Sequence, residues 1–150
     1  MQMPKVLVVD DEKDFLDTLV ERLKKRNIET EGVQNGEDCL ALLDKKTFDV
    51  IILDIRMPGG MDGIETLRAI KKVQPLTEVI LLTGHASLET SIDGMKLGAF
   101  DYLQKPVRLE SLLSKLAQAL NRKKDHEKRI RKGELQIKDL RRYQGWRLEE

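Results

Sequence analysis

Short apolar runs recur along the chain, and polar stretches separate them. The run Val6–Val9 is uninterrupted and rich in β-branched residues, which is typical of a strand buried on both faces. The segments "DVIIL" (49–53) and "EVILL" (78–82) repeat this pattern, and Ile28–Val33 is a weaker, alternating version. The pattern predicts five strands, over Lys5–Val9, Ile28–Val33, Asp49–Leu53, Glu78–Leu82 and Ala99–Leu103.

Apolar residues at helical spacing occupy the intervals between these runs. From Phe15 to Leu23, for example, they return every three or four residues and define one face of a helix. Pro75 marks the end of the third such segment and Gly98 the end of the fourth. The predicted helices are Lys13–Arg26, Gly36–Lys45, Ile64–Val73, Ser87–Leu97 and a fifth that begins at Arg108.

The alternation of strands and helices predicts an α/β fold with a parallel sheet covered by helices on both faces. Right-handed crossovers leave few ways to wind such a sheet. We expect a flavodoxin-like, doubly wound five-stranded parallel sheet in the order 2-1-3-4-5, with an extended C-terminal helix. In such a sheet a ligand lies beyond the carboxyl ends of the strands, near strands 1 and 3.

Composition is consistent with a soluble globular chain of 150 residues, with 40% hydrophobic and 35% charged residues. No apolar run approaches the roughly 20 residues of a membrane helix, and the first residues do not form a secretory signal. The one cysteine, Cys39, cannot form an internal disulfide. A reducing cytoplasm is therefore the expected location.

Charge divides the chain unequally. Residues 121–150 hold 11 Lys and Arg against 6 Asp and Glu, whereas residues 1–120 hold 16 against 20. An acidic body followed by a basic tail indicates two units. We predict a domain over 1–120 and a charged helical tail or linker over 121–150.

Polar side chains follow the predicted strands at their carboxyl ends. Strand 1 ends in Asp10 and Asp11, strand 3 in Asp54 and strand 4 in Thr83, while Lys105 follows strand 5. Because strands 1 and 3 are neighbours in the expected order, three carboxylates converge on one edge and raise one another's pKa unless a cation neutralises them. Oxygen ligands without His or Cys favour a hard ion, and Mg²⁺ fits best.

These residues form a plausible phosphoryl-transfer site. Asp54 would be the nucleophile and would form an acyl phosphate, while Asp10 and Asp11 hold Mg²⁺. Lys105 would pair with the phosphoryl oxygens and Thr83 would donate a hydrogen bond to one of them. Each residue taken alone is more simply explained as a helix cap or turn residue. Turn preferences, however, do not select a lysine and a threonine at the other two strand ends.

Four segments of the sequence resemble the receiver domain of two-component response regulators. The resemblance covers residues 5 to about 120 and is most like receivers of the NtrC type, which usually precede an ATPase domain that activates sigma-54 polymerase. Motif identity, order and spacing all agree with this CheY-like family. The segments are "VLVVDDE" (6–12), "DVIILDIRMPGGMDGIE" (49–65), "VILLTGHAS" (79–87) and "GAFDYLQKP" (98–106).

The resemblance implies a role for each site residue. Asp54 would accept a phosphoryl group from the histidine of a sensor kinase, with Lys105 as the family's lysine. Asp10, Asp11, Asp54 and the backbone carbonyl of Arg56 would be the metal's protein ligands. Two further residues of the motif set, Thr83 and Tyr102, would form the switch.

Phosphorylation would then reshape the face made by helix 4, strand 5 and helix 5, where a downstream protein or a second copy docks in this family. Catalysis would be limited to self-catalysed phosphotransfer and slow autodephosphorylation, so the chain is not expected to be a turnover enzyme. The alternative function is a Mg²⁺-dependent phosphatase-like enzyme that also uses an aspartyl phosphate. Such enzymes usually have a D-x-D nucleophile on strand 1 and a cap insertion, and the sequence shows neither. A phosphorylation-independent scaffold of the same fold is a third possibility.

One segment departs from the family pattern. Receivers of this type typically read "MPGMDG", whereas this chain reads "MPGGMDG", with an extra glycine at 59–60. Glycine adds conformational freedom, so we expect a looser loop after Asp54. The chemistry should survive, because Asp54 and Arg56 precede the insertion.

The tail leaves two interpretations open. Helix 5 could run on into it as a weak dimerisation helix, with a mixed apolar seam, or the segment could be a frayed and solvated helix. It shows no helix-turn-helix pattern, so we expect no direct nucleic-acid binding by this segment. The seam residues are Leu109, Leu112, Leu116, Ala119, Ile130, Ile137 and Leu140.

Overall fold

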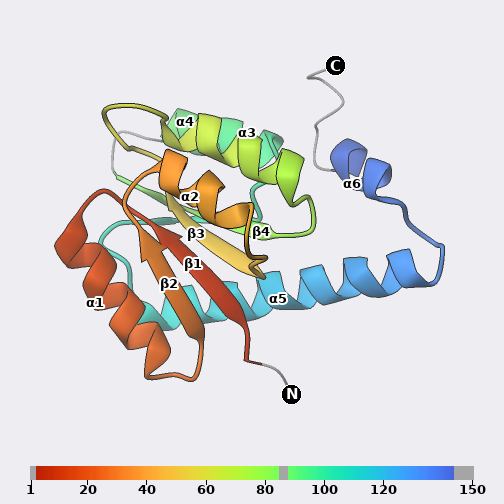
Figure 1. Cartoon of the computed structure of the whole chain (residues 1–150), viewed down its shortest axis with the longest axis horizontal. Helices are drawn as coiled ribbons and strands as arrows, with labels where there is room; N and C mark the ends of the chain where they lie inside the picture. The colour runs from red at the N-terminus through yellow and green to blue at the C-terminus, as the bar shows by residue number, and fades with distance from the viewer. Residues whose placement is uncertain (1–2, 85–87, 144–150) are drawn as a thin grey trace.

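A computed structural model describes residues 3–84 and 88–143. The strands form one parallel sheet in the order β2-β1-β3-β4-β5, which confirms the predicted topology (Figure 1). The last three residues of the motif "VILLTGHAS" lie outside the described residues. The strands are β1 (Lys5–Val9), β2 (Glu29–Val33), β3 (Val50–Asp54), β4 (Glu78–Thr83) and β5 (Asp101–Gln104).

Helices cover both faces of the sheet, with α1 and α5 on one side and α2, α3 and α4 on the other (Figure 1). Within residues 3–84 and 88–143, no helix is long and apolar enough to cross a membrane. The helices are α1 (Lys13–Lys24), α2 (Gly36–Leu43), α3 (Gly63–Val73), α4 (Leu88–Lys96), α5 (Leu109–Arg131) and α6 (Ile137–Tyr143).

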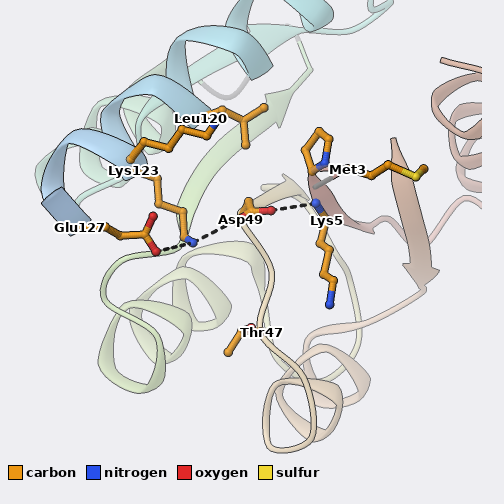
Figure 2. Close-up of a pocket in the computed structure, with 9 residues that line it drawn as sticks. Met3, Lys5, Thr47, Asp49, Leu120, Lys123 and Glu127 are labelled. Atoms are coloured by element: carbon orange, nitrogen blue, oxygen red, sulfur yellow. Dashed lines mark hydrogen bonds and ion pairs between the residues drawn. The ribbon is translucent and has the colours of Figure 1, made fainter. Parts of the chain in front are cut away.

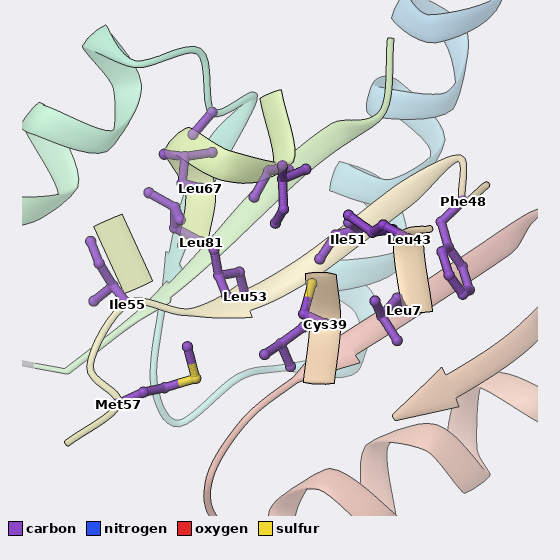
Figure 3. Close-up of a cluster of buried hydrophobic side chains, with 14 of the residues drawn as sticks. Leu7, Cys39, Leu43, Phe48, Ile51, Leu53, Ile55, Met57, Leu67 and Leu81 are labelled. Atoms are coloured by element: carbon purple, nitrogen blue, oxygen red, sulfur yellow. The ribbon is translucent and has the colours of Figure 1, made fainter. Parts of the chain in front are cut away.

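The core is divided into two layers by the alternation of side chains along each strand. Leu7, Ile51 and Leu81 point to one face and pack with Cys39 of α2 and Leu67 of α3 (Figure 3). The intervening strand residues point to the opposite face and pack against α1 and α5. Every residue of β3 and β4 is buried, as their continuous apolar runs predict.

The register of the sheet aligns the carboxyl ends of its central strands. Val9 of β1 pairs with Leu53 of β3, so Asp10 and Asp54 follow at the same level. On the other side, Asp54 pairs with Leu82 of β4, and Thr83 is the next residue along that strand. The topology alone therefore brings the predicted site residues to one edge.

The loop between β3 and α3 accommodates the additional glycine with two successive left-handed residues. Gly59 has φ 77° and Gly60 has φ 79°. Beyond them, the Met61 N–H donates to Glu37 Oε2 of α2 at 3.0 Å. Asp62 caps α3 and forms a reciprocal capping box with Glu65, the third residue of that helix. The second half of the loop is thus tethered, while the looser loop expected from the insertion stays a prediction.

The C-terminal region partly follows the sequence interpretation. Helix α5 runs beyond residue 120 and ends at Arg131, and Gly133 has φ 74° between it and α6. The predicted seam therefore does not lie on one continuous helix. Its first part, Leu112, Leu116 and Ala119, is buried against the chain's own sheet.

The start of α3 generates a stability prediction. A Cβ on Gly63 would lie 2.4 Å from the Ile55 carbonyl oxygen and 2.5 Å from its Cα. Because this neighbour is backbone directly after β3, Gly63→Ala should destabilise the fold by about 1–3 kcal/mol. Urea unfolding followed by circular dichroism measures the change. Gly84→Ala is the control, since a Cβ there meets nothing within 4 Å. Equal unfolding midpoints for the two variants would contradict the packing argument.

Candidate functional site

The predicted site lies at the carboxyl edge of the sheet, on residues that close its buried strands. Asp10 is fully buried directly after β1, Asp54 is 5% exposed at the end of β3, and Thr83 is 3% exposed at the end of β4. Apolar strands place these polar groups in a region with little water. Buried polar groups need partners, so the arrangement depends on what faces them.

Lys105 supplies the positive charge. Its Nζ lies 2.8 Å from Asp10 Oδ2, 3.1 Å from Glu12 Oε1 and 3.5 Å from Asp54 Oδ2. The Lys105 N–H donates to the Thr83 carbonyl oxygen at 2.7 Å, which fixes the chain after β5 beside β4. The ammonium also lies 4.5 Å from the centre of the Phe15 ring. One cation thus serves three carboxylates from β3 and the segment after β1.

Backbone donors orient the two buried carboxylates. The Glu12 N–H donates to Asp10 Oδ1 at 2.9 Å, and the Arg56 N–H donates to Asp54 Oδ1 at 3.1 Å. Each carboxylate therefore keeps Oδ1 on its own loop and turns Oδ2 toward Lys105. The Asp54 oxygen at 3.5 Å is the less tightly paired of the two.

Burial dominates the electrostatics of the site. It raises the pKa of Asp54 to about 6, with Asp10 and Asp11 adding to the rise, while the Arg56 N–H and Lys105 oppose it. Burial also raises the pKa of Asp10 against the lowering effect of its bond with Lys105. Burial alone would lower the pKa of Lys105, yet its bond with Asp10 and the charge of Asp54 raise it overall. The site is thus short of positive charge, as expected where a cation binds.

The donor set fits a hard divalent ion. Carboxylate oxygens of Asp10, Glu12 and Asp54 all lie within 4.8 Å of one another. They are oxygen donors without a nitrogen or sulfur ligand among them, which suits Mg²⁺. Sequence reasoning missed Glu12, although the third acid of "VLVVDDE" was its signal. Asp11 is half-buried and outside this group, so its role and that of the Arg56 carbonyl stay predictions.

The two predicted switch residues lie on the adjacent strands β4 and β5. Thr83 ends β4 beside Asp54 and pairs in register with Gln104 of β5. Tyr102, on β5, is 37% exposed. The structure therefore brings Asp10, Asp54 and Lys105 into direct contact and places Thr83 next to them at the end of β4. Tyr102 pairs in register with Leu81 of β4 and is partly exposed.

The raised pKa of Asp54 generates a pH-dependent stability prediction. A carboxyl whose pKa rises on folding favours the folded state at low pH, and that contribution is lost as pH rises from about 4 through 6. Asp54→Asn removes the buried charge and keeps an acceptor for the Arg56 N–H. The variant should be more stable than the parent by about 1–3 kcal/mol at pH 7.5 in EDTA, and this difference should fall to about a third at pH 4.5. Urea unfolding at both pH values measures this, and a pH-independent difference would contradict it.

Sequence comparisons find response regulators that are longer than this chain. The chain is 37% identical over 120 residues to "Putative response regulator NtrX-like" of Rickettsia bellii, covering 79% of this chain and 25% of the relative. It is 37% identical over 120 residues to "Response regulator protein PilR" of Pseudomonas aeruginosa, covering 80% and 27%. It is 36% identical over 121 residues to "DNA-binding transcriptional regulator NtrC" of Escherichia coli, covering 81% of this chain and 26% of the relative. The chain spans about a quarter of the length of these relatives.

Structural comparisons agree. A response regulator receiver domain protein of Clostridium thermocellum matches with TM-score 0.77 and 38% identity, over 81% of this chain and 98% of that one. The receiver domain of NtrX from Brucella abortus matches with TM-score 0.74 and 32% identity, over 77% of this chain and 98% of that one. NtrX from the same organism in complex with ADP gives 0.82 and 28%, over 95% of this chain and 33% of that one. The last match extends into the C-terminal region.

The family match itself covers most of the chain. Residues 6–117 match the family described as "Response regulator receiver domain". That range contains β2 to β5, nearly all of β1, and every residue predicted for the site. With the sheet order and the acidic edge already established, the chain belongs to the response regulator receiver domain family, as a receiver of the NtrC type.

Proposed function

We propose that Asp54 accepts a phosphoryl group from the phosphohistidine of a sensor kinase and that the receiver changes its partner contacts as a result. The observation that carries this proposal is the buried Asp54 carboxylate facing Lys105 and Asp10 at the carboxyl edge of the sheet. Of the three carboxylate oxygens near Lys105 Nζ, Asp54 Oδ2 is the farthest, at 3.5 Å. This oxygen is therefore the least tightly paired, and a phosphoryl group attached to it would still lie close to the lysine.

The transfer needs little more than position and charge. An oxygen of Asp54 attacks the phosphorus, the P–N bond to the kinase histidine breaks, and the histidine nitrogen leaves with the electrons of that bond. Mg²⁺, held by Asp10 and Asp54 with Asp11 and the Arg56 carbonyl as predicted ligands, would supply positive charge opposite the phosphoryl oxygens. Lys105 would turn from the carboxylates toward the new anion, which carries a charge of about −1.5 to −2.

The switch would follow from the added anion. Thr83 would donate its hydroxyl to a phosphoryl oxygen, and Tyr102 would rotate inward from its exposed position. The face formed by α4, β5 and α5 has exposed apolar side chains, among them Ile92 at 48% and Met95 at 36%. We propose this face as the docking surface for a downstream protein or for a second copy of the chain.

Phosphate release would be slow hydrolysis, and the receiver would act as a signalling domain and not as a turnover enzyme. No observation on the described residues favours the phosphatase-like alternative. We place the reaction in the cytoplasm, where the buried free thiol of Cys39 stays reduced. Because one relative is named a DNA-binding transcriptional regulator, we propose that the output is transcriptional and passes through protein contacts.

Phosphate labelling tests the proposed function directly. The chain, incubated with Mg²⁺ and radiolabelled acetyl phosphate, should take up at most one phosphate per molecule, and chelation by EDTA should abolish the uptake. Asp54→Asn should take up none, whereas Asp44→Asn, an exposed acid at the end of α2, should label like the parent. Rapid multiple turnovers on a phosphate monoester would instead support the phosphatase, and undiminished labelling of Asp54→Asn would refute the proposal.

The lysine has its own prediction. Lys105→Met removes a charge-assisted hydrogen bond to the site, so the initial rate of label uptake should fall about tenfold or more. Lys13→Met is the matched control, since this exposed lysine pairs with Asp17 on its own helix and should change the rate by less than about twofold. Equal rates for both variants would remove Lys105 from the mechanism.

A further inference from the structure

A buried group of charges lies at the opposite edge of the sheet, where the strands begin. Glu78, the first residue of β4, is fully buried, and so is Lys71 of α3. Lys71 Nζ lies 3.7 Å from Glu78 Oε1 and donates to the Thr77 carbonyl oxygen at 2.7 Å. Burial lowers the pKa of Lys71 to about 8, with the charge of Arg122 adding to the fall while Glu78 opposes it.

The second cation comes from α5. Arg122 pairs with Glu78 through two nitrogens, Nε with Oε2 and Nη2 with Oε1, the latter at 2.6 Å. Such two-pronged pairs combine charge with fixed geometry. The guanidinium also lies 4.7 Å from the centre of the Phe100 ring, just before β5. Arg122 is thereby held between the start of β4 and the segment that leads into β5.

The next residue of α5 makes a separate contact. Lys123 Nζ lies 2.9 Å from Asp49 Oδ1, while Asp49 Oδ2 accepts a hydrogen bond from the Lys5 N–H at 2.8 Å (Figure 2). Asp49 thus joins α5 to the starts of β1 and β3. Glu127, one turn further along α5, lies 3.2 Å from Lys123 Nζ and completes the chain of charges.

These contacts carry α5 beyond the family match. The match ends at residue 117, whereas Arg122, Lys123 and the buried His126 follow it on the same helix. Burial lowers the pKa of His126, which lies within electrostatic reach of Glu78 and Arg122. A solvated tail has no need of such partners, because its charges would face water on every side.

We propose that the amino edge of the sheet is a docking surface for residues 118–131 of the chain itself, with Arg122 as the anchor that seats on Glu78. The body and the helical extension then form one rigid unit, and the extension sets the direction in which any following segment leaves the domain. This inference goes beyond the proposed function and needs no phosphate on Asp54.

The energetic reason lies in the burial of Glu78. A carboxylate in a dry environment needs close positive charge, and removing one partner of a buried pair leaves the other uncompensated. Arg122 remains protonated at all accessible pH values, unlike Lys71. The extension therefore supplies Glu78 with a second, permanent positive charge at closer range than Lys71, and Glu78 in turn fixes the position of the extension.

Amide hydrogen exchange on the whole chain tests the inference. In the parent protein, residues 118–131 should be protected, and Arg122→Gln should speed their exchange about tenfold or more while β1 and β3 keep their protection. Lys124→Gln, an exposed neighbour on the same helix, is the matched control and should leave the exchange unchanged. Unprotected residues 118–131 in the parent, or unchanged protection in Arg122→Gln, would overturn the inference.

A double-mutant cycle guards against simple misfolding. Glu78→Gln alone removes the buried charge that Arg122 compensates, so Glu78→Gln with Arg122→Gln should speed exchange of residues 118–131 by less than the product of the two single effects. Independent, multiplicative effects would overturn the pairing. Label uptake on Asp54 should be equal in the parent and Arg122→Gln, so failure of labelling and failure of docking are separate results.

Discussion

The candidate site depends on carboxylates that are buried at the end of an apolar sheet. A parallel arrangement forces the ends of β1, β3 and β4 to the same edge, and the sequence places acids on two of them. Burial penalises their charged forms, and Lys105 reduces the penalty without removing it. The remaining deficit of positive charge is the physical basis for the proposal that a divalent cation and a phosphoryl group bind at this edge.

The two edges of the sheet solve the same physical problem in different ways. At the carboxyl edge, one ammonium is shared among three carboxylates, and a deficit of positive charge remains. At the amino edge, Glu78 has two buried or half-buried cations within reach and no deficit remains. The first arrangement leaves room for an added cation, while the second holds α5 against the sheet.

Much of this structure could be predicted from the sequence. Continuous apolar runs gave the strands because both faces of the sheet are covered, and alternation with helices gave the parallel order. Asp10, Asp54 and Lys105 could be brought together because strand ends share an edge whatever the side chains do. Glu12 could not be assigned to the site in this way, because its contact with Lys105 depends on the path of the chain after β1 and not on the strand register.

The amino edge escaped sequence reasoning for a related reason. Glu78 opens a run that was predicted as a buried strand without a partner for its charge, and Arg122 falls in the segment that was predicted as a charged tail. Their pairing spans 44 residues and depends on how far α5 runs along the sheet. Charge composition separates body from tail at the level of averages, but individual ion pairs cross that boundary.

A side chain of a helix that is buried against one neighbour cannot also contact another. The face of α5 that contains Leu112, Leu116 and Ala119 is buried against the sheet. Residues of this face are therefore not available for self-association, and any contact between two copies through α5 would use its other sides.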